Sequence, residues 1–337
     1  MDDETSCQYI SSRGIVKSCE RRNRIIQSST RNIDPDLFDN LEKDDTVIHI
    51  CSFLTISTFA THIAPKLTKR IILVTNDSDF DSPIFEKPVG KGDEINKEAI
   101  LQFLNSDKCA HWFTQNCTLQ HPKVTPIPIG MDYHTFHQAY GIPPRTQEQS
   151  ILSIAQNPTT KPFHKRILKC YCNFKFTMVG KYYTDDRLQC LQQVPNELMY
   201  QEETYLPIRE DTWKRQKLFA FVLSPAGGGY DCHRTWEALL LGCIPIVKRF
   251  HIPHENVYAN LPILIVNEWS DITENLLQQT VDLFQQQYNT FQWEKLTLAY
   301  WKQLIYSYKI NPCQTETMET QKTSCATRAD AISTTHL

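Results

Sequence analysis

The sequence predicts an α/β protein with two halves, each a parallel β-sheet covered by helices, and three observations support this fold class. Short apolar runs alternate with helical patterns in both parts of the chain, which is typical of parallel sheets. Residues 146–165 are rich in Pro, Gln and Thr without a sustained period, so we expect a linker there. The chain has 337 residues, 41% hydrophobic and 22% charged, enough for two globular domains. We expect ligands to bind in the cleft between the two halves.

The first half is predicted over residues 41–145. It follows an arm, residues 1–40, whose polar and patternless sequence favours a poorly ordered or peripheral segment. The predicted elements of this half alternate in chain order: a strand over 46–53, a helix ended by Pro65, a strand over 71–74 that runs into an acidic loop, a helix over 94–106, and a strand that ends at Gly130. The strand runs are apolar throughout, which indicates burial on both faces of the sheet.

The second half is predicted over residues 166–290, where the same alternation resumes. Its predicted elements in chain order are a strand over 166–176, a helix over 185–194, a strand over 218–225, a helix over 231–242, strands over 243–247 and 261–266, and a helix over 271–287. A last amphipathic helix is predicted over 293–308, within the segment 291–310. The tail, 311–337, is dominated by Thr, Ser and Ala, so we expect it to be disordered.

Composition excludes several classes of function. A net charge of −3 gives no general reason to bind nucleic acid. No apolar stretch approaches the ~20 residues that span a bilayer, and the N-terminus lacks the apolar core of a signal peptide. The 12 cysteines are scattered along a long chain, which indicates reduced thiols rather than a disulfide framework. We therefore expect a cytoplasmic protein without a transmembrane segment.

A glycine-rich turn joins a predicted strand to a predicted helix. The apolar run ends at Ser224, and Gly227, Gly228 and Gly229 follow, with Arg234 in the next helix. Glycines let a backbone approach a ligand closely, and a helix N-terminus favours an anion, phosphate above all. The spacing matches neither the P-loop nor the dinucleotide-binding fingerprint. The turn therefore predicts a phosphate site of another kind, or else only a tight structural turn.

Three segments resemble exostosin-like glycosyltransferases. "SPAGGGYDCHRTWEALLLGCIPIV", residues 224–247, resembles their donor-binding segment, in which a Ser-Pro-x-Gly turn, an Arg and a Glu-Ala helix precede Gly-Cys-Ile-Pro. Residues 112–136 resemble the end of the acceptor-side domain in soluble virus- and microbe-type relatives. Residues 173–191 resemble, more weakly, an Asn-Phe segment followed by an Arg-bearing helix. Together the resemblance covers about residues 45–305.

The resemblance implies a GT-B fold, in which two Rossmann-like domains face a central cleft. It implies a nucleotide-sugar donor on the C-terminal domain, a UDP-sugar being favoured, and a glycan or glycoprotein acceptor on the N-terminal one. It further implies an inverting glycosyltransferase that needs no metal or other cofactor, and a last helix that crosses back to the N-terminal domain. Many cellular members carry a membrane anchor that this sequence lacks, so we expect the cytoplasm, the host cell's if the protein is viral.

On this interpretation the departing nucleoside diphosphate must be neutralised by protein groups. Arg234 is the first choice for this role and Arg187 the second, although Arg187 could be an ordinary surface arginine. Glu237 could accept hydrogen bonds from the ribose hydroxyls, or it could pair with Arg234. The remaining expected donor contacts come from the glycine turn itself: Ser224, Gly227, Gly228, Gly229 and Tyr230.

An inverting transfer also needs a base that takes the proton of the acceptor hydroxyl. We favour Asp79 for this role, with Asp77 next, because both follow the strand over 71–74 and the relatives carry an acidic residue there. A solvated acidic loop is the alternative. Asp132 and His134 also lie at a strand exit facing the predicted cleft. Asp132 is expected on the acceptor side, and His134 could be a base, an acceptor contact or a structural histidine.

Two other functions compete with this interpretation. Asp77, Asp79 and Asp81 form an Asp-x-Asp-x-Asp series that in a GT-A glycosyltransferase would bind manganese. The other competitor is a non-catalytic carbohydrate-binding protein on a transferase fold. Short zinc-like spacings also occur, but they do not combine into a four-ligand pattern and we predict no metal site from them: His134-x-x-His137, His251-x-x-His254 and Cys170-x-Cys172.

Overall fold

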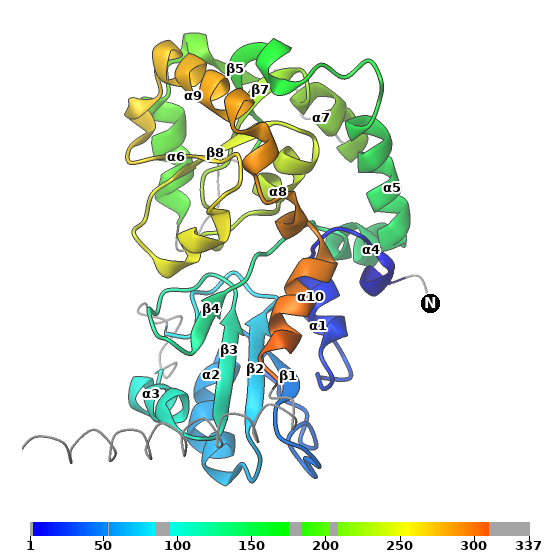
Figure 1. Cartoon of the computed structure of the whole chain (residues 1–337), viewed down its shortest axis with the longest axis vertical. Helices are drawn as coiled ribbons and strands as arrows, with labels where there is room; N and C mark the ends of the chain where they lie inside the picture. The colour runs from blue at the N-terminus through cyan, green and yellow to red at the C-terminus, as the bar shows by residue number, and fades with distance from the viewer. Residues whose placement is uncertain (1–2, 53, 85–94, 175–182, 203–207, 310–337) are drawn as a thin grey trace, which may run out of the picture.

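The chain folds into two parallel sheets stacked end to end (Figure 1). The computed structural model describes residues 3–52, 54–84, 95–174, 183–202 and 208–309. The first sheet has four strands in the order β1-β2-β3-β4, and the second has five in the order β6-β5-β7-β8-β9. All named strand pairs are parallel, which confirms the predicted α/β class with a parallel sheet in each half. The expected disordered tail, 311–337, lies outside the described residues.

The first sheet contains one strand more than the sequence pattern predicted. β1 (Thr46–Cys51) and β2 (Ile71–Asn76) are buried at every residue, as their apolar sequences predict. β3 (Cys109–Thr114) was not predicted. Its two neighbours are β2 and the short β4 (Val124–Pro126), so the predicted strand ending at Gly130 leaves the ladder early.

The second sheet follows the predicted alternation. Its strands are β5 (Ile167–Cys172), β6 (Met199–Gln201), β7 (Phe219–Leu223), β8 (Ile244–Lys248) and β9 (Leu264–Val266). Sequence patterns missed β6, which has three residues and no apolar run. The α-helices of the described chain are α1 (Ser12–Ser18), α2 (Leu54–Thr58), α3 (Lys97–Asn105), α4 (His134–Tyr140), α5 (Pro144–Ala155), α6 (Thr184–Gln193), α7 (Arg209–Gln216), α8 (His233–Leu240), α9 (Glu274–Gln286) and α10 (Leu298–Ser307).

The first part of the N-terminal segment belongs to the core, so the prediction of a poorly ordered or peripheral arm over 1–40 is wrong for residues 7–19, whereas residues 20–40 are mostly exposed and contain no helix or strand. Ile10 and Ile15 are each only 1% exposed. The Ile10 amide donates to the carbonyl of Leu296 at 2.9 Å, and its carbonyl accepts from the Met131 amide at 2.7 Å. The partners that bury this segment lie more than a hundred residues away, so its local sequence gives no sign of them.

The predicted linker, 146–165, is also wrong over its first part. α5 continues to Ala155, and it buries Ile151 and Ile154 because these lie three residues apart on one helical face. Only the residues after α5 lack a helix or strand, until the short turn Phe163–Lys165.

The last helix returns to the first sheet, where α10 lies beside α1 (Figure 1). Tyr306 donates its hydroxyl hydrogen bond to the Ser18 carbonyl at 2.8 Å, and the Tyr308 ring lies 3.8 Å from that of His111 in β3. The predicted helix over 293–308 is divided in two, since Thr297 is extended and caps α10 by accepting from the Tyr300 amide. No helix in the described part of the chain is long and apolar enough to cross a membrane.

Replacing Gly130 with alanine is expected to lower the free energy of unfolding by about 2–4 kcal/mol. Gly130 has a φ of +68°, and an added Cβ would lie 2.3 Å from the Ile10 carbonyl oxygen. Gly141→Ala is the matched control, because Gly141 has the same φ of +68° but no atom within 4 Å of an added Cβ. That variant should cost about 1 kcal/mol. Urea unfolding measures both, and equal losses would show that the close approach to Ile10 contributes nothing.

Candidate functional site

The two halves meet where the carboxyl end of β2 faces the carboxyl end of β7. The glycine turn after β7 lies directly against the acidic loop after β2. An added Cβ would lie 2.1 Å from the Asp79 Oδ2 atom at Gly228, and 2.4 Å from the Asn116 Nδ2 atom at Gly229. At Gly227 it would lie 2.5 Å from the Arg187 Nη2 atom. The glycines are therefore needed for the protein's own close approach, and this structure is closed at the site.

The backbone of the glycine turn is partly occupied by protein groups in this closed arrangement. The Ala226 amide donates to the Asp186 carboxylate at 2.8 Å, and the Gly227 amide donates to the Gly229 carbonyl at 2.9 Å. Just beyond the turn, the Asp231 amide donates to the Asn116 Oδ1 atom at 3.0 Å. A phosphate could use the Ala226 and Gly227 amides only after these bonds are exchanged.

Arg187 and Arg234 meet at the edge of this turn. Their guanidinium carbons lie 5.8 Å and 5.3 Å, respectively, from the centre of the buried Phe174 ring. Burial, and then the charge of Arg234, lower the pKa of the Arg187 guanidinium. Among the residues that the structure describes, the Nη1 atom of Arg234 is buried without a hydrogen-bond partner. Two like charges with an unsatisfied buried donor make a site that an anion would stabilise.

Asp77 and Asp79 occupy different environments although they are two residues apart. Asp79 lies against Gly228, and its charge acts on Arg187. Asp77 is buried, lies 3.7 Å from the Nε atom of Arg13, and accepts from the Ser28 hydroxyl at 2.8 Å. Burial raises the pKa of the Asp77 carboxyl, and the charge of Arg13 opposes this shift.

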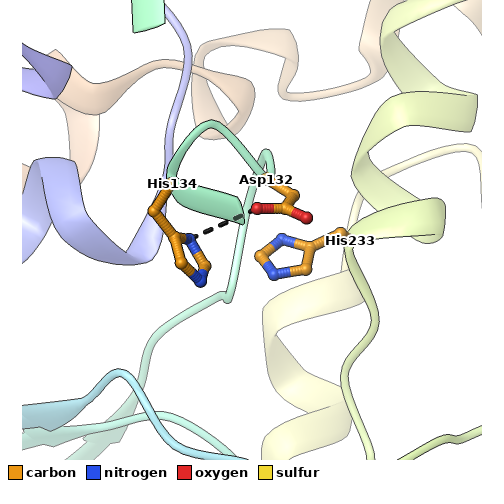
Figure 2. A group of neighbouring side chains, drawn as sticks. All are labelled: Asp132, His134 and His233. Carbon is orange, nitrogen blue, oxygen red and sulfur yellow. Dashed lines mark ion pairs between the residues drawn. The ribbon is translucent and has the colours of Figure 1, made fainter. Parts of the chain in front are cut away.

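A second cluster lies at the same interface and consists of Asp132, His134 and His233 (Figure 2). The Asp132 Oδ1 atom lies 3.3 Å from the His134 Nδ1 atom. His233 belongs to the other half, and its Nδ1 atom lies 2.7 Å from the Gly130 carbonyl oxygen. Burial tends to raise the pKa of Asp132, but His233, His134 and Arg209 together lower it to about 2. Burial lowers the pKa of His134 to about 4, so its imidazole is neutral near pH 7.

Several of the predicted donor contacts point away from this interface. The Ser224 hydroxyl forms a hydrogen bond with the Thr235 hydroxyl at 2.8 Å, which links the start of the turn to α8. Tyr230 is buried and donates its hydroxyl hydrogen bond to the Lys248 carbonyl at 3.3 Å. Glu237 does not pair with Arg234, because it binds Arg209 and accepts from the Trp213 indole at 2.9 Å.

Within the described residues, neither the competing Asp-x-Asp-x-Asp series nor the His134-x-x-His137 spacing forms a metal-ligand cluster. Asp81 accepts a hydrogen bond from the Tyr183 hydroxyl at 2.8 Å, while Asp77 faces Arg13. Within the described ranges, the group with metal-ligand spacing is Asp132, His134 and His233. His137 is instead exposed, with its Nδ1 atom 3.1 Å from the Ile142 carbonyl.

Sequence patterns missed the residues that hold the two halves together. Asp231 is 3% exposed and accepts from the Ile129 amide at 2.8 Å, the Trp236 indole at 3.0 Å and the Tyr258 hydroxyl at 2.9 Å. His233, the third residue of the second cluster, was also missed. Asp231 and His233 flank Cys232, just after the glycine turn and before Arg234. Their place in this stretch was the signal from which the sequence could have indicated a functional role.

A separate hollow lies elsewhere, with a volume of about 920 Å³. Its walls include Tyr9, Leu152, Phe163, Leu240 and Trp293. None of the predicted site residues lines it. We place the candidate site at the interface between the halves, because charged groups of opposite sign converge there.

Comparison of the sequence with protein-family models and with curated proteins finds no match.

Proposed function

We propose that the protein is a glycosyltransferase that moves a sugar from a nucleoside-diphosphate sugar, a UDP-sugar being favoured, to a hydroxyl of a glycan or glycoprotein acceptor. The observation that carries the proposal is the convergence of Arg187 and Arg234 at Phe174, opposite Asp79 of the other half. One half of the interface thus offers positive charge for a diphosphate, and the other offers a carboxylate for a hydroxyl proton. The resemblance to exostosin-like enzymes, with an inverting GT-B mechanism, agrees with this division.

Arg234 and Arg187 would bind the diphosphate and stabilise the charge that develops as it leaves. The buried Nη1 atom of Arg234 has no hydrogen-bond partner in the described part of the chain, so a phosphate oxygen would satisfy a donor that is otherwise costly to bury. Charge stabilisation by fixed groups is strongest where water is excluded. These two side chains supply the charge without requiring a metal at the diphosphate.

Asp79 would take the proton of the acceptor hydroxyl as it attacks the anomeric carbon. It lies against the glycine turn that would border the donor, whereas Asp77 is held by Arg13 and Ser28. Asp79 therefore has the shorter path to the sugar. A substrate must first part Asp79 from Gly228, so donor binding requires the two halves to separate locally.

One nucleoside diphosphate is expected to raise the melting temperature of the protein. A ligand that binds only the folded state stabilises it by RT ln(1 + [L]/Kd), about 2.7 kcal/mol at a hundredfold excess over Kd. The measurement is a thermal-shift series with UDP, GDP, ADP and CMP, each compared with a nucleotide-free baseline at the same EDTA concentration. The shift over that baseline should survive EDTA.

The other outcomes identify the competing functions. A shift that appears only with manganese would contradict diphosphate binding by arginines alone and favour the Asp77, Asp79 and Asp81 series as a metal site. No shift with any nucleotide would overturn the proposal and leave a carbohydrate-binding protein as the better explanation.

A further inference from the structure

Three side chains of metal-binding type come together from the two halves of the molecule. Asp132 and His134 follow the last strand of the first sheet, and His233 begins α8 of the second half. One potential ligand atom from each lies within 4.8 Å of the other two. In Figure 2 the carboxylate and both rings gather at one point between the two ribbons.

Hydrogen bonds orient two of these side chains for binding a metal. Because a carbonyl oxygen can only accept, the Nδ1 atom of His233 carries the proton donated to Gly130, and its Nε2 atom keeps a free lone pair. Metal-binding histidines commonly donate their other ring N–H to a backbone carbonyl in this way. The Thr135 amide donates to the Asp132 Oδ1 atom at 3.0 Å and fixes the carboxylate.

The distances fit a small ion. In a tetrahedral zinc site, bonds of 2.0–2.2 Å place neighbouring ligand atoms roughly 3.4 Å apart. The Asp132 and His134 atoms are already 3.3 Å apart. One ring nitrogen of His233 lies within 4.8 Å of the other two ligand atoms. Two imidazoles and one carboxylate suit Zn²⁺ better than Mg²⁺ or Ca²⁺, which prefer oxygen ligands.

The neighbouring positive charges are each paired with another carboxylate. Arg209 donates to the Asp132 main-chain carbonyl at 2.6 Å, but its charge is paired with Glu237. Arg13, whose charge acts on His134, lies beside Asp77. The Asp132 carboxylate therefore remains the local anion available to a cation.

We propose that Asp132, His134 and His233 form a zinc-type divalent-metal site that fastens the two halves of the molecule together. The ligands come from both halves, so the ion can bind all three only in the closed arrangement. Metal binding would therefore stabilise that arrangement by mass action. The proposal does not rest on the glycosyltransferase function, and it leaves the diphosphate to Arg187 and Arg234.

Zn²⁺ is expected to bind the full chain at one equivalent after dialysis against a chelator and removal of the chelator. Isothermal titration calorimetry gives the stoichiometry, and Co²⁺ in place of Zn²⁺ gives visible absorption bands that report the coordination geometry. Bound Zn²⁺ should raise the melting temperature by a few degrees. His233→Ala, His134→Ala and Asp132→Asn should each weaken binding by at least about 100-fold. His137→Ala is the matched control, since its ring lies on the same helix as His134 but outside the cluster.

Two results would overturn the proposal. One is the absence of one-equivalent Zn²⁺ binding to the wild-type chain. The other is binding that the three variants leave intact, or that His137→Ala reduces equally. His134→Gln provides a second test if the alanine variants do not fold, because it is close in size and removes the imidazole. Loss of Zn²⁺ binding in this variant, with an unchanged melting temperature in the metal-free state, supports the site, and retained binding contradicts it.

Discussion

Replacing Arg234 with alanine is expected to weaken nucleoside-diphosphate binding by about 10- to 100-fold and to lower kcat by about 100- to 1,000-fold. The binding loss corresponds to a charge-assisted hydrogen bond in a buried site, because the Arg234 Nη1 atom is buried without a partner among the described residues. The larger loss in kcat follows if the same group stabilises the charge that develops as the diphosphate leaves. Calorimetry with the nucleotide identified by thermal shift, and steady-state kinetics, measure the two effects separately.

The stability of the ligand-free Arg234→Ala variant distinguishes a binding role from a structural one. Arg234 lies beside Arg187, whose pKa is lowered by burial and by that neighbouring charge. Removing one of two like charges should therefore leave the melting temperature unchanged or raise it. Residues that bind a ligand often destabilise the ligand-free protein, and a melting temperature that does not fall would agree with such a role for Arg234. A marked fall in melting temperature would mean that Arg234 supports the fold instead.

Two further variants control for charge and geometry. Arg234→Lys keeps the positive charge but loses the planar, two-pronged contact, so it should bind the nucleotide with intermediate affinity. Arg249→Ala removes an arginine of the same half that is paired with Glu255. It should change neither Kd nor kcat. An equal loss in Arg249→Ala would reduce the effect to net charge and remove the specific role of Arg234.

The convergence of Arg187, Arg234 and Asp79 was predictable because each follows a strand of a parallel sheet. The carboxyl ends of parallel strands lie at one edge, and two such edges face each other here. The alternation of apolar runs and helical patterns was therefore sufficient to predict that these distant residues lie near one another. Which side chains would touch was not predictable, as the pairing of Glu237 with Arg209 rather than Arg234 demonstrates.

What the sequence did not reveal depends on contacts between distant segments. Ile10 and Ile15 stand in a polar stretch, and they are buried in a core cluster with residues from distant segments, among them Met131, Leu296 and Leu298. His233 and Asp132 are likewise separated by about a hundred residues and become neighbours only when the halves close. Local periodicity and residue spacing do not predict contacts between distant segments. The buried N-terminal segment and the second cluster are therefore visible only in the structure.

Asp79→Asn is expected to lower kcat by about 1,000-fold while nucleotide affinity stays within about threefold of the wild type. Asparagine has nearly the same shape, so the close approach to Gly228 is kept. It cannot take a proton, however. The variant should therefore lose the chemical step and keep the donor site, which calorimetry and single-turnover transfer measure independently.

Variants of the two neighbouring carboxylates test whether Asp79 itself is the base. Asp81→Asn is the matched control, because Asp81 accepts a hydrogen bond from the Tyr183 hydroxyl. This variant is expected to keep kcat within about threefold of the wild-type value. Asp77→Asn removes a buried partner of Arg13, so its main effect should be a lower melting temperature and not a lower kcat. If Asp77→Asn abolished transfer in a folded protein while Asp79→Asn remained fully active, the base would be Asp77. If both variants transferred sugar at the wild-type rate, neither carboxylate would be the base.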